Sequence, residues 1–143
     1  MPVRSLVSFI GAAFVCVIAV STGAAPEQHS VWSGVYTDAQ ANQGASLYKT
    51  HCVSCHGDSL AGGEQVPALR GVSFGATWES VPLSDLFERI RKTMPPGKNG
   101  VLTRQEYANV LAYVLKMNGM PAGAALASDQ SALAVIVFQS NKP

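Results

Sequence analysis

The pattern of apolar positions predicts an export sequence followed by a helical domain. Residues 6–20 form a nearly unbroken apolar run behind Arg4, and small residues and Pro26 follow it. This layout is typical of a secretory signal peptide, so we predict that residues 1–24 are removed by cleavage after Ala24. A retained membrane anchor is the alternative, but the run is short against the roughly 20 apolar residues that a span needs.

The first helix is predicted to begin at Thr37 and to run into the first of two closely spaced cysteines. Thr37 and Gln40 form a capping box, in which each side chain bonds the other residue's backbone N–H. Apolar and small residues then recur at helical spacing. Gly44 interrupts this pattern and costs a helix about 1 kcal/mol relative to alanine. We therefore expect another helix to approach closely at Gly44.

Two more helices are predicted further along the chain. An apolar stripe follows Pro82 and stops at the helix-breaking sequence Pro-Pro-Gly at 95–97. A third helix begins at a second capping box, formed by Thr103 and Glu106, and ends at the Asn-Gly pair at 118–119. No strand pattern is visible in this body, so the predicted fold class is all-α, with about three main helices.

The remaining segments complete the predicted domain organisation. The many glycines of residues 57–77 predict a loop. We expect a leader at 25–36, a domain at 37–120 and a tail at 121–143. The tail contains the apolar sequence "ALAVIVF" at 132–138, which is too short to span a bilayer. It predicts a short helix or a strand, covered by its own domain or by a partner. So few helices make a thin core, which favours a domain that binds a group at its centre.

The charge of the chain argues against nucleic acid as a partner. The sequence has 10 Lys and Arg against 9 Asp and Glu, a balance that lacks the excess of basic residues seen in nucleic-acid-binding domains. The distribution is uneven, because residues 27–88 hold seven acidic and two basic residues, whereas residues 89–105 hold five basic and no acidic ones. A basic surface on the second part would favour an acidic partner.

The stretch "HCVSCHG" carries the chemistry of the chain. Cys16 lies in the predicted signal peptide, so the mature chain keeps Cys52 and Cys55, separated by two residues, with His56 directly after them. The pattern C-x-x-C-H is typical of covalent attachment of a c-type haem. Two thiols so close together can reach the two vinyl groups on one edge of the porphyrin, and the histidine then faces the iron. Export agrees with this, because such haem is attached outside the bacterial inner membrane.

Other uses of the two cysteines explain less of the sequence. A structural zinc site needs four ligands, and the remaining histidines, His29 and His51, do not complete a second ligand pair. A redox dithiol needs a preceding strand, which is not predicted here. A plain disulfide stays possible, but it does not account for the adjacent histidine.

A second axial ligand would define the redox chemistry of the iron. Met94 is the strongest candidate, because the two prolines after it impose a rigid extended turn that can aim its thioether. The other candidates are Met117, Met120, His29 and His51.

Four segments together resemble a single-haem class I cytochrome c. They are "GASLYKTHCVSCHG", "PALRG", "TMPPG" and "EYANVLAYVLKMNG", and the resemblance covers residues 37–119. It is closest to bacterial periplasmic cytochromes associated with quinoprotein dehydrogenases. The resemblance implies one haem c attached through Cys52 and Cys55, with His56 as the proximal iron ligand and Met94 as the distal one.

The resemblance also implies roles for residues around the haem. Pro67 and Leu69 would belong to the binding site, with the Pro67 carbonyl accepting a hydrogen bond from the second nitrogen of the proximal histidine. Trp78 would donate a hydrogen bond to a haem propionate. Gly44 and Tyr48 would pack against Tyr113 where the first and last helices cross, which would explain the mid-helix glycine.

The implied function is electron transport in the periplasm, not enzymatic catalysis. An iron with two strong axial ligands has no open position, so it exchanges one electron without rearranging. The expected partners are redox proteins: a dehydrogenase as donor, and an oxidase or another cytochrome of a respiratory chain as acceptor, with no membrane anchor after cleavage. Two alternatives stay open, a cytochrome subunit of an obligate dehydrogenase complex and a five-coordinate haem protein that binds small ligands.

Overall fold

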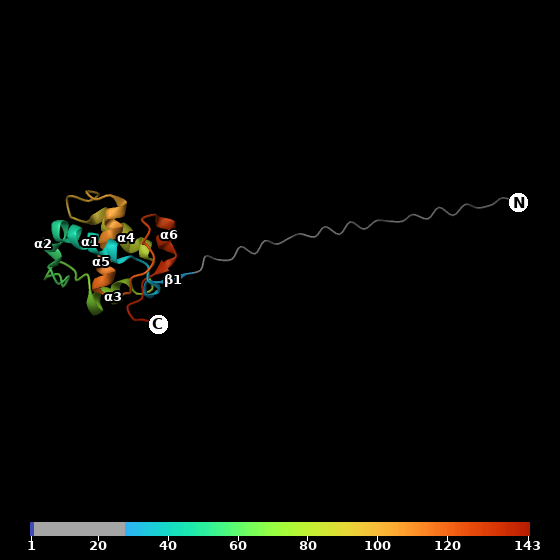
Figure 1. The fold of residues 1–143 in the computed structure, drawn as a ribbon, viewed down its shortest axis with the longest axis horizontal. Coiled ribbons are helices and arrows are strands. Elements are labelled where there is room, and N and C mark those ends of the chain that lie inside the picture. Colours follow the sequence, from blue (N-terminus) through green and yellow to red (C-terminus); the bar gives the residue numbers. More distant parts are fainter. Residues whose placement is uncertain (2–27) are drawn as a thin grey trace.

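The computed structural model describes Met1 and residues 28–143 (Figure 1). The rest of the predicted signal peptide, including Cys16, lies outside the described residues. The described chain is mostly helical, which confirms the predicted all-α class. Its elements are β1 (His29–Ser30), a 3-10 turn at Val31–Ser33, α1 (Asp38–His51), α2 (Val53–His56), α3 (Gly71–Trp78), α4 (Leu83–Thr93), α5 (Arg104–Met117), α6 (Gln130–Ala134) and β2 (Ile136–Val137).

The three helices predicted from sequence are α1, α4 and α5. Both capping boxes are formed: the Thr37 hydroxyl accepts from the N–H of Gln40 at 3.2 Å, and the Thr103 hydroxyl accepts from the N–H of Glu106 at 3.2 Å. In both boxes the glutamine or glutamate side chain accepts in return from the N–H of the threonine. Helix α4 ends at Thr93, directly before the Met-Pro-Pro turn. These boundaries confirm the predicted ones.

The prediction of a continuous loop over residues 57–77 is wrong, because α3 begins at Gly71. The inner side of α3 carries Phe74, which is buried and packs edge-on against the Phe138 ring of the tail, with ring centroids 5.6 Å apart. Burial of this aromatic face outweighs the weak helix propensity of Gly71 and Gly75, since tertiary packing overrides intrinsic propensity.

The leader and the tail form a two-stranded parallel sheet that the sequence pattern did not predict. His29 pairs with Ile136, and Ser30 with Val137. Next to this pair, the indole N–H of Trp32 donates to the carbonyl oxygen of Gln139 at 2.9 Å. The leader is thus held by contacts with residues more than 100 positions away.

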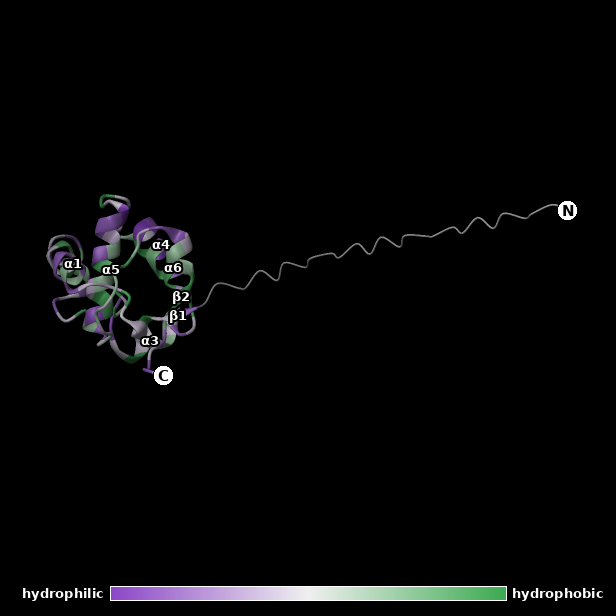
Figure 2. Ribbon diagram, turned by 45° about the vertical axis from the view of Figure 1, so that its right-hand side comes forward, coloured by the Kyte–Doolittle hydropathy of each residue, from purple (hydrophilic) through white to green (hydrophobic). Residues whose placement is uncertain are grey.

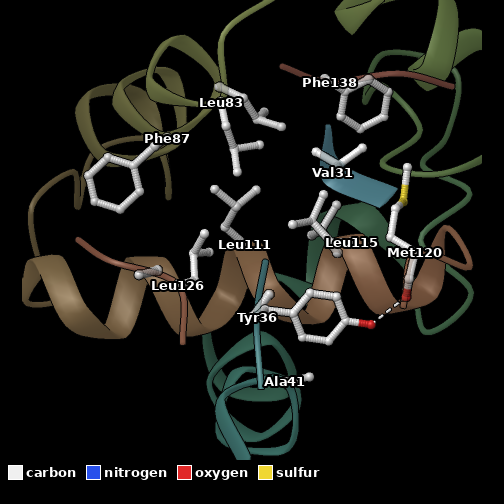
Figure 3. Close-up of a cluster of buried hydrophobic side chains, with 14 of the residues drawn as sticks. Val31, Tyr36, Ala41, Leu83, Phe87, Leu111, Leu115, Met120, Leu126 and Phe138 are labelled. Atoms are coloured by element: carbon white, nitrogen blue, oxygen red, sulfur yellow. Dashed lines mark hydrogen bonds between the residues drawn. The ribbon is translucent and has the colours of Figure 1, made fainter. Parts of the chain in front are cut away.

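The hydrophobic core lies between α4, α5, the leader and the tail (Figure 3). Helices α4 and α5 carry both hydrophobic and hydrophilic residues, as the mixed colours of Figure 2 show. Helix α4 buries Leu83, Leu86 and Phe87, whereas α5 is buried over most of residues 107–115. The apolar tail is covered by its own domain, since Leu126, Leu133 and Phe138 are at most 2% exposed. Tyr36 closes the core by donating its hydroxyl to the carbonyl oxygen of Met120 at 2.6 Å. No helix within residues 28–143 has the length and apolar character needed to cross a membrane.

Candidate haem-binding site

The two cysteines lie where α1 passes into the short helix α2. The backbone N–H of Cys52 still bonds the Tyr48 carbonyl at 2.8 Å, so the chain continues almost helically into α2. Gly57 then ends α2 with a φ of 73°. Both thiols are free; Cys52 is half-buried and Cys55 is exposed. Burial, with a smaller contribution from Cys55, raises the pKa of Cys52 to about 11, so its thiol is protonated at neutral pH.

The imidazole of His56 is buried and held in one orientation. Its Nδ1 lies 3.0 Å from the carbonyl oxygen of Pro67. A carbonyl can only accept, so Nδ1 carries a proton in this contact, and in the neutral imidazole the lone pair that can bind a metal is then on Nε2. Every fully buried side-chain nitrogen or oxygen in the described chain has a hydrogen-bond partner, whereas Nε2 has none there. It follows that the Nε2 atom is not fully buried, although the His56 residue as a whole is only 6% exposed.

Two residues that the sequence analysis missed hold the loop that carries Pro67. Gly62 donates its N–H to the His56 carbonyl at 3.0 Å, and a Cβ on Gly62 would lie 2.7 Å from the Pro67 carbonyl carbon. Asn118, at the end of α5, donates to the Leu69 carbonyl at 2.9 Å and accepts from the N–H of Gly71 at 3.1 Å. In the sequence, the Gly-Gly pair at 62–63 indicates a turn, whereas Asn118 indicates only the end of a helix and not its bonds to the loop.

Tyr48 holds the other side of the cysteine stretch. Its ring packs on Tyr113 with centroids 5.3 Å apart, which confirms the predicted contact. Its hydroxyl donates to the Gly57 carbonyl at 2.7 Å, a bond that the sequence did not indicate. Burial is the main cause that raises the pKa of Tyr48 to about 12, so the hydroxyl keeps its proton at physiological pH. Tyr48 therefore ties α1 to the end of α2.

The remaining predicted site residues lie on separate elements. Met94 caps α4 in an extended conformation, is half-buried, and accepts a hydrogen bond on its carbonyl from the Tyr107 hydroxyl at 2.9 Å. Trp78 ends α3, half-buried against Phe74, and Leu69 packs partly buried on the core. A cleft of about 710 Å³ runs along α3 and the end of α5, and neither predicted iron ligand lines it.

The donor set fits a covalently attached haem. Two free thiols, separated by two residues, lie directly before an imidazole whose Nε2 is available. A thioether, Met94, is carried on a different element, as a ligand on the opposite face would have to be. Histidine with methionine or another strong ligand is the usual axial pair of electron-transfer cytochromes c.

An all-α fold with a C-x-x-C-H sequence after its first main helix defines a class I cytochrome c. The family model described as cytochrome c oxidase, cbb3-type, subunit III, matches residues 39–114, and the chain belongs to this family. It is thus a c-type cytochrome, a class of haem-based electron-transfer protein.

A curated relative gives a second comparison. The chain is 32% identical over 100 residues to the cbb3-type cytochrome c oxidase subunit CcoP of Cereibacter sphaeroides, an alignment covering 62% of this chain and 34% of that protein. The chain thus matches about a third of the relative's length. No solved structure matches the chain. The association with quinoprotein dehydrogenases stays a prediction.

Proposed function

We propose that this chain is an electron carrier with one haem c, attached through Cys52 and Cys55 and ligated by His56 and Met94. The observation that carries the proposal is the 3.0 Å contact between His56 Nδ1 and the Pro67 carbonyl, next to two free thiols. This contact fixes the tautomer and the ring orientation, as a carbonyl does for many metal-binding histidines.

Each residue of the proposed site has a separate task. A bound haem supplies the one-electron redox chemistry. His56 and Met94 would be the protein ligands of the iron and would thus exclude other ligands, and the soft sulfur of Met94 would raise the reduction potential. Leu69 contributes apolar surface that keeps water away, and Trp78, at the end of α3, is proposed to donate to a propionate. No residue is assigned to bond making or breaking, so the proposed function is not enzymatic.

The proposed partners are redox proteins of the periplasm, with a dehydrogenase as donor and an oxidase or another cytochrome as acceptor. The signal-like residues 1–24 support export. Near Met94, Glu88 pairs with Arg91, Lys92 and Arg104, which leaves that group net positive. Exposed Arg89 and Lys98 add to it without an ion pair in the described chain. A partner with an acidic surface fits best, so its reaction rate should fall with rising ionic strength, and a flat salt dependence would contradict steering.

Family membership favours a second candidate, the same electron transfer within a fixed complex. The family description and the curated relative both concern a subunit of an oxidase. Size-exclusion chromatography of the haem-loaded chain separates the two, because a free carrier elutes as a monomer, whereas an orphan subunit is expected to aggregate.

The visible spectrum of the haem-loaded chain tests the ligand assignment. We expect sharp low-spin bands and the weak far-red band of methionine bound to ferric iron. Met94→Ala should abolish the far-red band and allow carbon monoxide to bind, whereas Met117→Leu, at the end of α5, should change neither. A far-red band that persists in Met94→Ala would exclude Met94. A wild-type protein that binds carbon monoxide readily would point to the five-coordinate alternative.

A further inference from the structure

One tyrosine hydroxyl holds the loop that carries Met94 at two points. Tyr107 lies in the second turn of α5 and is only 1% exposed. Its hydroxyl donates to the Met94 carbonyl at 2.9 Å and accepts from the N–H of Gly100 at 3.0 Å. The bonded residues are six positions apart, at the start and near the end of the loop between α4 and α5. A single buried hydroxyl thus provides a hydrogen-bond partner for two backbone groups, the Met94 carbonyl and the Gly100 N–H, that have no such partner within a helix.

We propose that Tyr107 is a positioning residue that keeps the Met94 thioether at the iron. The inference rests on the proposed ligand role of Met94. Both hydrogen bonds of the hydroxyl go to backbone groups, so they leave the thioether free while limiting where the loop can move. Loss of both bonds would let the loop open more often, and an open loop leaves the distal position to competing ligands.

The base of the loop is held independently of Tyr107. Glu88, in the middle of α4, pairs with Arg104, the first residue of α5, at 3.0 Å. The Arg104 guanidinium also lies 4.9 Å above the Phe87 ring and donates to the Ser128 carbonyl at 2.9 Å. These contacts should keep α4 and α5 together when the hydroxyl is removed. The expected effect is therefore local opening of the loop without unfolding of the domain.

The test compares Tyr107→Phe with Tyr36→Phe in the haem-loaded full chain. Tyr36 is a matched control, because it is also buried (2% exposed) and also donates its hydroxyl to a methionine carbonyl, that of Met120 at 2.6 Å. Imidazole, which competes with Met94 for ferric iron, is the probe. Removing the Tyr107 hydroxyl should tighten imidazole binding about fivefold to thirtyfold, the factor expected for one to two lost hydrogen bonds. It should also bleach the far-red band below the unfolding temperature. Tyr36→Phe should leave imidazole affinity unchanged.

The outcomes separate this inference from the proposed function. If Met94→Ala keeps the far-red band, the ligand assignment fails and the role of Tyr107 falls with it. If the band depends on Met94, the ligand assignment stands, and the imidazole affinities of the two tyrosine variants then test the positioning role of Tyr107. Equal imidazole affinities for wild type, Tyr107→Phe and Tyr36→Phe would overturn the positioning role, as would an equal gain in both variants.

Discussion

Gly44 of α1 lies directly against the backbone of Asn109 in α5. A Cβ on Gly44 would come within 1.8 Å of the Asn109 carbonyl oxygen and 3.0 Å of the Tyr113 Cβ. No side chain larger than hydrogen fits this contact, so the glycine that looked costly within α1 sets how closely the two helices cross. The crossing matters for the site, because α1 leads straight into Cys52.

We therefore predict that Gly44→Ala destabilises the fold by at least about 3 kcal/mol, since the backbone of α5 cannot move aside cheaply. Chemical denaturation of the haem-loaded chain measures this. Ser46→Ala, on the exposed side of the same helix, is the control and should be neutral or slightly stabilising. Equal stability of the two variants would mean that the helices do not pack as described.

Replacement of Gly62 should change the reduction potential through the proximal histidine. An alanine Cβ there would lie 2.2 Å from the Val66 carbonyl oxygen, and the φ of 68° is strained for any side chain. The loop must shift, which weakens the bond from His56 Nδ1 to Pro67. Because that bond makes the imidazole a stronger donor and so favours ferric iron, the potential should rise, by about 40 mV for a loss near 1 kcal/mol.

Potentiometric titration of Gly62→Ala checks this shift against Gly63→Ala. Gly63 has no atom within 4 Å of an added Cβ, and its φ is not positive, so its variant should keep the wild-type potential. A potential that is unchanged in both variants would argue against control of the iron through Pro67.

Glu88 should make stability fall in acid over a defined pH range. Its hydrogen bond with Arg91 is the main cause that lowers the pKa of its carboxyl from 4.5 to about 2, and Arg104 and Lys92 contribute further. The folded-state pKa is below the unfolded one, so the stabilisation is complete above pH 4.5 and is lost as the pH falls toward 2. Thermal melts of Glu88→Gln should show lower stability at neutral pH and a shallower decline in this range. Glu64→Gln, in an exposed loop, should follow the wild type.

The tail should contribute to the stability of the isolated chain. Leu133 of α6 is fully buried, so Leu133→Ala should cost about 2–5 kcal/mol in unfolding free energy. Val72 is 92% exposed on α3, and Val72→Ala should change stability by less than about 0.5 kcal/mol. If Leu133→Ala is as stable as Val72→Ala, the tail does not pack on this domain in solution.

The helix boundaries and the cysteine motif could be predicted because they depend on neighbours in the chain. A capping box joins residues three positions apart, so Thr37 with Gln40 and Thr103 with Glu106 were visible as local patterns. The spacing of Cys52, Cys55 and His56 is likewise local, and its chemistry follows from the residue types. Resemblance to cytochromes suggested the partner of His56, since Pro67 is 11 positions away across a glycine loop.

By itself, then, the sequence determined α1, α4, α5, the all-α class and the stretch that can hold a haem. Only the tertiary structure decided that α3 forms, that the leader and the tail pair through Ser30 and Val137, and that the Tyr107 hydroxyl donates to the Met94 carbonyl. The reason is physical: hydrogen bonds within one helical turn are specified by adjacent residues, whereas these contacts depend on segments that only the folded core brings together. A hydroxyl such as that of Tyr107 can serve any nearby carbonyl, and the packing of α5 against the loop selects which one.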